Sequence, residues 1–268
     1  MSAPQTGERT FFGHPRGLAT LFFTEMWERF SYYGMRAFLI LYMVKALGMT
    51  DKDAGSIYGT YTGSVWLAAI GGGIIADRLL GHYRSVLLGG AIIMLGHFTL
   101  AFPGIGALYG GLALIVAGTG LLKPNVSILV GSLYEKGDER RDAGFSVFYM
   151  GINLGAFLGP LVVEGLAEKV NWHIGFAAAG VGMAFGLVQY VLGKKHLEPG
   201  IARLAAKPAM APGSSGKPAA FTPEDWKRIT AIVVFFMAAS LFWGAYEQAG
   251  TSLTLFADRY VDRHVFGF

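Results

Sequence analysis

Residues 85–122 read SVLLGGAIIMLGHFTLAFPGIGALYGGLALIVAGTGLL, a run of 38 residues without a single Asp, Glu, Lys or Arg. About 20 apolar residues are enough for a helix to cross the hydrocarbon core of a bilayer. The run is interrupted at Pro103-Gly104-Ile105-Gly106, where proline and glycine favour a turn. It therefore predicts two membrane-spanning helices joined by a tight turn.

The same pattern continues on both sides of this run. Only 15% of the 268 residues are charged, whereas a typical soluble domain has about a quarter. Further charge-free stretches occupy residues 54–76, 143–163, 170–193 and 229–246. They are continuously apolar rather than alternating, which is typical of helices. We predict an all-α polytopic membrane protein with spans at 18–44, 54–76, 85–102, 109–133, 144–166, 172–192 and 229–255.

The basic residues predict the orientation of these spans. With a cytoplasmic N-terminus, the inner segments carry 14 Lys and Arg residues and the outer segments carry 5. Positive residues accumulate on the cytoplasmic side of membrane proteins. The net charge of +4 then reflects anchoring at the inner face, and we expect no nucleic-acid partner. The first apolar stretch contains Glu25, Glu28 and Arg29, which a signal-peptide core would not tolerate, so we expect it to be retained.

Composition also predicts the domain organisation. Residues 207–223 are rich in Pro, Gly, Ala and Ser, as flexible linkers are. We expect a six-helix transmembrane bundle over 1–192, a cytoplasmic linker over 193–228, and a seventh helix that begins an incomplete second bundle over 229–268. The other loops are too short to hold a soluble catalytic domain.

The reactive residues argue against an enzyme. The chain has no cysteine, so disulfides, thiol nucleophiles and cysteine-ligated metals are excluded. None of the six histidines is spaced as a pair of metal ligands, and no nucleophile–base pair stands out. We expect no catalytic residue, no metal site and no cofactor.

Span one carries the strongest functional signal, because residues 25–36 read EMWERFSYYGMR. At 100° per residue, six polar side chains share one sector about 140° wide: Glu25, Glu28, Arg29, Tyr32, Tyr33 and Arg36. Four charges near mid-membrane oppose insertion by about 10–14 kcal/mol on an insertion scale. Such residues usually face a water-filled cavity and mark a substrate or ion path. A salt-bridge lock without transport is the structural alternative.

Other polar residues lie in spans four, five and seven. They are Lys123-Pro124-Asn125, Asn153 and Glu247-Gln248. At 1.5 Å of rise per residue, Glu28 matches Lys123 in depth, and Arg36 matches Glu247. Arg29, Arg36 and Lys123 are the intramembrane cations of the first six spans.

Glycines and the inner loop suggest how the helices pack. Gly151, Gly155 and Gly159 recur every four residues, and Gly71-Gly72-Gly73 lies in span two. Both patterns allow helices to approach closely. The segment after span two, from Gly73 to Arg84, resembles the inner-loop motif of major-facilitator transporters. By that resemblance, Asp77 and Arg78 brace neighbouring helix ends.

Together these residues resemble the proton-dependent oligopeptide transporter (POT) family of the major facilitator superfamily. The matching motifs cover nearly the whole chain: Glu25-x-x-Glu28-Arg29-Phe30-x-Tyr32-Tyr33, Gly118-Thr-Gly-Leu-Leu-Lys123-Pro124-Asn125, Phe148-Tyr149-x-x-Ile152-Asn153-x-Gly155-x-x-x-Gly159-Pro160 and Phe242-Trp243-x-x-x-Glu247-Gln248. The resemblance implies a symporter that imports di- and tripeptides by alternating access, with protons as the coupling ion.

The resemblance also implies roles for individual residues. Proton coupling is assigned to Glu25, Glu28, Arg29, Lys123 and Glu247. Peptide binding is assigned to Tyr32, Tyr33, Arg36, Lys123, Asn153 and Trp66, although Trp66 stands where many relatives have a tyrosine. The outer gate is assigned to Arg36 and Glu247, and the inner loop to Asp77 and Arg78. A monomer embedded in lipid is expected, in a cell membrane, by resemblance the bacterial inner membrane.

Such proteins have at least twelve spans, so we expect this chain to correspond to the N-terminal bundle plus the seventh span, as an incomplete polypeptide. Three alternatives compete with this interpretation. A major-facilitator carrier for nitrate, a drug or a sugar would share the bundle without needing the span-one cluster. A seven-helix retinal protein needs a lysine that span seven lacks, and a membrane hydrolase needs a nucleophile–base pair or a metal cluster.

Overall fold

The computed structural model describes residues 10–206 and 221–262 of the chain. It divides into two compact units, residues 1–206 and residues 207–268. The described residues are almost entirely helical, which confirms the predicted all-α class.

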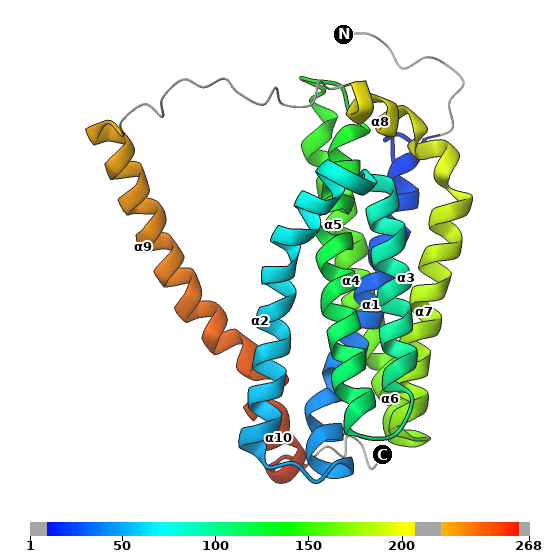
Figure 1. The fold of residues 1–268 in the computed structure, drawn as a ribbon, viewed down its shortest axis with the longest axis vertical. Coiled ribbons are helices and arrows are strands. Elements are labelled where there is room, and N and C mark those ends of the chain that lie inside the picture. The colour runs from blue at the N-terminus through cyan, green and yellow to red at the C-terminus, as the bar shows by residue number, and fades with distance from the viewer. Residues whose placement is uncertain (1–9, 207–220, 263–268) are drawn as a thin grey trace. The chain divides into compact units, whose positions relative to one another are not determined.

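The first unit contains six long helices (Figure 1). They are α1 (Gly17–Leu41), α2 (Asp51–Ile75), α3 (His82–Leu100), α4 (Ile105–Ser132), α5 (Arg140–Gly159) and α7 (Trp172–Leu192). The shorter helices α6 (Gly165–Lys169) and α8 (Lys194–Ala206) follow α5 and α7. Wider π-helical turns continue α1, α2 and α5, namely η1 (Tyr42–Ala46), η2 (Ala76–Leu80) and η3 (Pro160–Glu164).

The chain is a multi-pass membrane protein. Across the described ranges, six helical segments are both long and apolar enough to cross a bilayer. They are Asp51–Leu80, His82–Leu100, Ile105–Ser132, Arg140–Lys169, Trp172–Leu192 and Pro223–Tyr260. With its 25 residues α1 has the length of a span, but it carries the polar cluster described above. Seven spans were predicted, and each has a helix in the structure at that place.

Turn residues end these helices where the sequence suggests. Gly81 and Gly104 have φ angles of 74° and 106°, which L-residues with a side chain rarely adopt. Gly104 separates α3 from α4 and confirms the tight turn predicted inside residues 85–122. Thr50 and Asn171 cap the starts of α2 and α7, because their side chains accept hydrogen bonds from the backbone N–H groups of Asp53 and Ile174.

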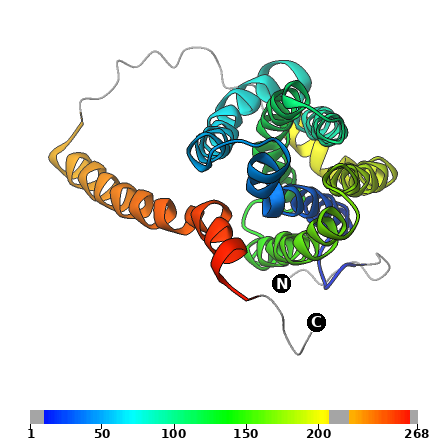
Figure 2. The same cartoon turned by 90° about the horizontal axis from the view of Figure 1, so that it is seen from below.

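Small residues set the distances between the helices, which Figure 2 shows end-on. A Cβ atom added to Gly155 would lie 2.1 Å from the carbonyl oxygen of Met26, and one added to Gly159 would lie 2.4 Å from that of Phe30. The backbones of α5 and α1 therefore touch along the glycine stripe. Elsewhere in the bundle, α4 packs against α2 and α3, and α7 packs against α1 and α3.

A short turn precedes α1 at the end of the bundle that also carries α8. Phe11 and His14 exchange backbone hydrogen bonds of 2.9 Å, and between them Phe12 and Gly13 have positive φ angles. His14 is buried, and its Nδ1 lies 3.1 Å from the hydroxyl of Tyr134, just beyond the end of α4. This turn therefore attaches the chain start to the loop between α4 and α5.

The structure differs from the sequence analysis in the segment assigned to the linker, 193–228. Residues 194–206 of that segment form α8, and α9 begins at Pro223; residues 207–220 lie outside the described part. Leu197 and Gly200 of α8 are buried, and Arg203 donates hydrogen bonds to the carbonyl oxygens of Ser132 and Leu133 at 3.1 and 2.9 Å. The helix is stable because its apolar face packs against the end of α4.

The second unit contains α9 (Pro223–Tyr246), the 3₁₀ turn η4 (Glu247–Gly250) and α10 (Ser252–Tyr260). A capping box starts α9, in which Thr222 and Asp225 satisfy each other's backbone N–H groups. The predicted seventh span ended at residue 255, whereas here the α9 helix gives way to η4 at Glu247.

Candidate functional site

The centre of the first unit contains a buried cluster of charges on α1. Glu25, Glu28 and Arg29 are exposed to only 2%, 0% and 2%. The Nε atom of Arg29 lies 3.2 Å from Oε1 of Glu25 and also contacts Oε2 of Glu28. The single guanidinium therefore bridges two carboxylates. Glu25 and Glu28 precede Arg29 by four residues and by one residue, which places both on the same side of the helix.

The cluster retains unused bonding capacity. Oε2 of Glu25, Oε1 of Glu28 and Nη2 of Arg29 are buried and have no hydrogen-bond partner among the described residues. Burying such polar atoms unpaired costs about 1–3 kcal/mol each, and more when the group is charged. A structural lock would satisfy these atoms, so the arrangement fits a site that exchanges protons or partners better than it fits a permanent brace.

Lys123 of α4 supplies the second positive charge near the two carboxylates. It lies close enough to both for a Coulomb interaction, which brings the group of four charges to neutrality. The depth estimate had matched Lys123 with Glu28, but Glu28 pairs with its neighbour Arg29 instead. The Nζ atom of Lys123 lies over the ring of Trp66 in α2, 5.3 Å from its centroid.

Arg36 lies two turns further along α1, among tyrosines. Its Nε donates a 2.9 Å hydrogen bond to the hydroxyl of Tyr58, and its Nη1 donates a 3.2 Å bond to that of Tyr32. The guanidinium carbon also lies 5.2 Å and 5.1 Å from the two ring centroids. Two aromatic faces and two hydroxyls therefore fix the guanidinium, which remains partly exposed.

Tyr58 and Tyr61 of α2 were not predicted as site residues. Both are buried, and the ring of Tyr61 lies 6.4 Å from that of Tyr32. Their signal in the sequence was the spacing of three residues, which places two tyrosines on one face of α2. That spacing alone could not show that this face meets Arg36.

The remaining predicted peptide-binding residues lie at the edge of this region. Tyr33 is partly exposed, and the guanidinium of Arg29 lies 5.9 Å from its ring centroid. Asn153 of α5 is exposed, because it lies on the side of the helix opposite to the glycines that meet α1. The structure therefore brings Lys123 and Trp66 together, and Arg36 and Tyr32 together, while Asn153 has no bond to either pair.

The inner loop forms its own polar contact. Nε2 of His82 lies 3.7 Å from Oδ1 of Asp77, and Nδ1 of His82 lies 2.7 Å from Oδ1 of Asn125. Asn125 in turn donates a 2.7 Å hydrogen bond to the carbonyl oxygen of Leu121. The start of α3 is thereby tied to α4 next to Pro124, through which α4 remains continuous. Arg78 is exposed.

Glu247 belongs to the second unit. It is the first residue of η4, where the 3₁₀ turn interrupts the helical run between Tyr246 and Ser252. A break in the helix near the middle of a span is where membrane carriers place ion-coordinating groups. The predicted partner of Glu247 in the outer gate, Arg36, belongs to the first unit.

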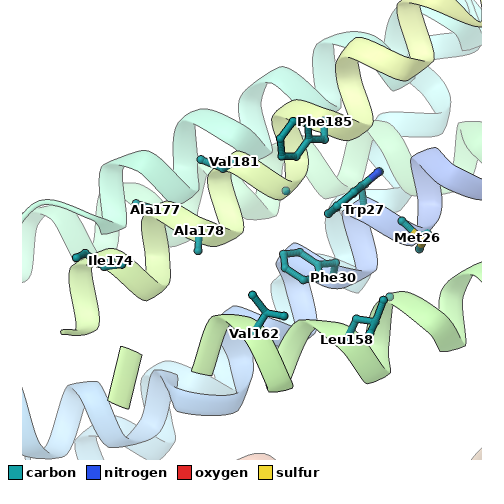
Figure 3. Close-up of a pocket in the computed structure, with 12 residues that line it drawn as sticks. Met26, Trp27, Phe30, Leu158, Val162, Ile174, Ala177, Ala178, Val181 and Phe185 are labelled. Atoms are coloured by element: carbon teal, nitrogen blue, oxygen red, sulfur yellow. The ribbon is translucent and has the colours of Figure 1, made fainter. Parts of the chain in front are cut away.

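A cavity of about 590 Å³ lies elsewhere, between α1, α5 with its continuation η3, and α7 (Figure 3). It is lined by apolar side chains, including Trp27, Phe30, Val162 and Phe185. None of the charged residues of α1 lines it. This hydrophobic groove therefore has no chemistry for a charged or zwitterionic substrate, and the polar site lies on the other side of α1.

Comparison with known proteins places this architecture in a family. Residues 83–200 match a family model described as the POT family. The uncharacterized transporter YclF of Bacillus subtilis is 41% identical over all of this chain and 64% of its own length. A di-/tripeptide transporter of Lactococcus lactis is 49% identical over 75% of this chain and 42% of its own length.

Solved structures agree with this similarity. The crystal structure of a mutant of peptide transporter POT in complex with alafosfalin is 42% identical, with a TM-score of 0.86. The match covers 97% of this chain and 64% of that protein. The same transporter in complex with sulfate gives a TM-score of 0.80 at 41% identity. This chain thus spans between 42% and 64% of the length of these relatives, and it shares the helical architecture of the solved structures.

Proposed function

Because this chain belongs to the POT family, we propose that it forms the amino-terminal part of a proton-coupled symporter that imports di- and tripeptides by alternating access. The observation that carries the proposal is the buried cluster of Glu25, Glu28 and Arg29 beside Lys123. Such charges are expensive inside a membrane unless they serve a substrate or ion path. The Lactococcus lactis relative is named a di-/tripeptide transporter, which favours peptides over nitrate, drugs or sugars.

We assign the peptide carboxylate to Arg36 and Lys123. Both cations are partly exposed, whereas Arg29 is buried and occupied by two carboxylates. Tyr32, Tyr33 and Trp66 would line the path, and Asn153 would donate a hydrogen bond to the peptide. If so, Lys123→Ala should weaken peptide affinity strongly, while Lys195→Ala on the exposed face of α8 should not. Unchanged affinity in Lys123→Ala would place the carboxylate elsewhere.

Proton coupling is assigned to Glu25, Glu28, Arg29 and Lys123, together with Glu247 of the second unit. A nearby cation lowers the proton affinity of a carboxylate, and burial without a cation raises it. Any movement that takes Arg29 or Lys123 away from the two carboxylates of α1 would therefore load a proton. Movement back would release the proton, so protonation and conformation would alternate together.

The outer gate is proposed to join Arg36 and Glu247. These residues belong to the two bundles that rock against each other in alternating access, and protonation of Glu247 would weaken their attraction. A charge swap tests the pair. The double variant Arg36→Glu with Glu247→Arg should close the outer side better than either single variant, as distances between outer helix ends would show. A double variant as open as the singles would exclude the pair.

At the inner side, we propose that Asp77 and Arg78 brace the ends of neighbouring helices. Their matched variants are Asp77→Asn and Arg78→Gln. Each should shift the protein towards the inward-open state, which distances between the inner helix ends would report. No shift in either variant would leave the inner loop without a bracing role.

We further propose a cell membrane location, a cytoplasmic N-terminus, a monomer in lipid and no cofactor beyond protons. The absence of cysteine allows a clean topology test. Single cysteines in place of Lys136 and Lys169 should react with a membrane-impermeant thiol reagent from inside and outside, respectively. The reverse pattern would invert the orientation.

Uptake measurements test the function itself. Proteoliposomes containing this chain, or this chain extended by the carboxyl-terminal part of a relative, are given a labelled dipeptide and an inward proton gradient. We expect accumulation that unlabelled di- and tripeptides compete away and that nitrate and sugars do not. Accumulation competed only by a non-peptide solute would make the protein a different major-facilitator carrier.

A further inference from the structure

The ammonium group of Lys123 has one close aromatic neighbour. Its Nζ lies 5.3 Å from the ring centroid of Trp66. Within residues 10–206 and 221–262, the group forms neither a hydrogen bond nor an ion pair, although two carboxylates of α1 lie near enough to attract it. A cation within about 6 Å of an indole face is held by the quadrupole of the ring, and tryptophan is the strongest of the aromatic residues in this respect.

The packing of α2 on α4 explains why the ring lies below the ammonium. Gly120 is one turn before Lys123, and a Cβ atom added to it would lie 2.7 Å from the Cβ of Ala68. Ala68 is two residues from Trp66, so the two backbones are in contact at this level. The Trp66 ring therefore extends from α2 at a level where α2 and α4 are closely packed. The ring is also 67% exposed, and Lys123 beside it is partly exposed.

We propose that Trp66 is a positioning residue for Lys123. The indole face keeps the ammonium from collapsing onto Glu25 and Glu28, and presents it to the carboxylate of an incoming peptide. The proposal rests on the proposed function for the identity of the anion, but the contact itself does not. Trp66 would therefore act on the peptide through Lys123, in addition to lining the path.

The contact can be tested without any transport. 5-Fluorotryptophan is inserted at position 66. Its ¹⁹F NMR signal is then recorded in the absence of peptide, once in the protein that has Lys123 and once in the Lys123→Gln variant. Removal of the charge should move the resonance. The matched control carries the label at Trp27, whose ring faces Phe30 and Phe185; its signal should stay in place. If the signal at position 66 does not respond to Lys123→Gln, the proposal is overturned.

The role is tested by weakening the contact in small steps. Tryptophans with one to four fluorine atoms at position 66 keep the shape of the ring but progressively lose cation binding. We expect the KM for a dipeptide to rise along this series, and to be about three- to thirtyfold higher in Trp66→Leu, with Trp66→Tyr between the two. The value of kcat should stay within about twofold, because Lys123 is still present to take part in turnover.

The two experiments separate the positioning role of Trp66 from the proposed transport function. A flat KM across the fluorinated series, with a responsive ¹⁹F signal, would show that the contact exists but positions nothing, and would overturn the proposal. An unfluorinated protein that transports no peptide would instead contradict the proposed function. In that case the ¹⁹F experiment still decides whether Trp66 holds Lys123.

Discussion

Gly72 of α2 and Gly120 of α4 lie so close that a Cβ atom added to Gly72 would be 1.9 Å from the carbonyl oxygen of Gly120. Real Cβ atoms essentially never approach an oxygen so closely. The α2–α4 contact therefore depends on glycine at this position. The same contact places Trp66 of α2 beside Lys123 of α4.

The neighbours of Gly72 provide the matched control for a stability prediction. Cβ atoms added to Gly71 or Gly73 would meet nothing within 4 Å. Gly72→Ala should lower the free energy of unfolding by about 1–3 kcal/mol, because overpacking pushes the helices apart. Gly73→Ala should be neutral or slightly stabilising, since alanine is the better helix former. Thermal unfolding in detergent measures both, and equal losses would show that the contact is not tight.

The hydrogen bond between Arg36 and Tyr58 predicts a specific effect on peptide affinity. Tyr58→Phe removes the acceptor that holds Nε of Arg36 at 2.9 Å. Bonds to charged groups contribute about 1.5–3 kcal/mol, but Arg36 is partly exposed, so we expect roughly a tenfold rise in the KM for a dipeptide. Tyr61→Phe is the control, because the Tyr61 hydroxyl is buried without a partner; the KM should hardly change. Similar rises in both variants would point to lost packing instead.

The turn at the chain start should respond to pH through His14. Burial, helped by the positive charge of Arg140, lowers the pKa of His14 below its ordinary value of 6.5. The unfolded turn then binds more protons than the folded one. The contribution of neutral His14 to the stability of the turn is therefore fully present above about pH 6.5. It is lost as the pH falls through the lower pKa that His14 has in the folded turn.

Hydrogen exchange of the Phe11 and His14 amides, which bond across this turn, measures the effect. After correction for intrinsic rates, protection should fall between about pH 7.5 and about pH 5.5. His14→Gln cannot titrate, so its protection should be lower but independent of pH. An equal pH dependence in that variant would assign the effect to another group.

The α8 helix should depend on the hydrogen bonds of Arg203. The side chain donates to two carbonyl groups at the end of α4, which otherwise lack partners within the helix. Arg203→Ala should cost about 1 kcal/mol, discounted for partial exposure. It should also raise hydrogen exchange throughout 194–206, whereas Lys195→Ala should not. If protection of α8 stays unchanged, its apolar face alone holds the helix.

Much of the fold could be predicted from the sequence, because charge-free runs and helix-ending residues are local features. The run at 85–122 contains its own turn, and the span predicted at 172–192 coincides with α7. α8 could not be predicted in this way. Its residues 194–206 include Lys, Glu and Pro, and its helix depends on Leu197 fitting against the far end of α4.

The candidate site was predictable to the extent that it lies on one helix. The shared face of Glu25, Glu28 and Arg29 follows from their spacing, and the structure pairs all three. Contacts between different helices could not be predicted from spacing within one helix. The depth estimate matched Lys123 with Glu28, but helix rise says nothing of rotation, and the ammonium lies over Trp66 instead. Tyr58 was missed for the same reason.

The central claim is that the carboxylates of α1 couple proton movement to peptide movement, and Glu28→Gln tests it most directly. In proteoliposomes, the variant should lose accumulation of a dipeptide driven by a proton gradient, yet retain exchange of labelled for unlabelled peptide at equal concentrations. Glu198→Gln, on the exposed face of α8, should retain both activities. Proton-driven accumulation in Glu28→Gln at the level of the unmodified protein would contradict this account.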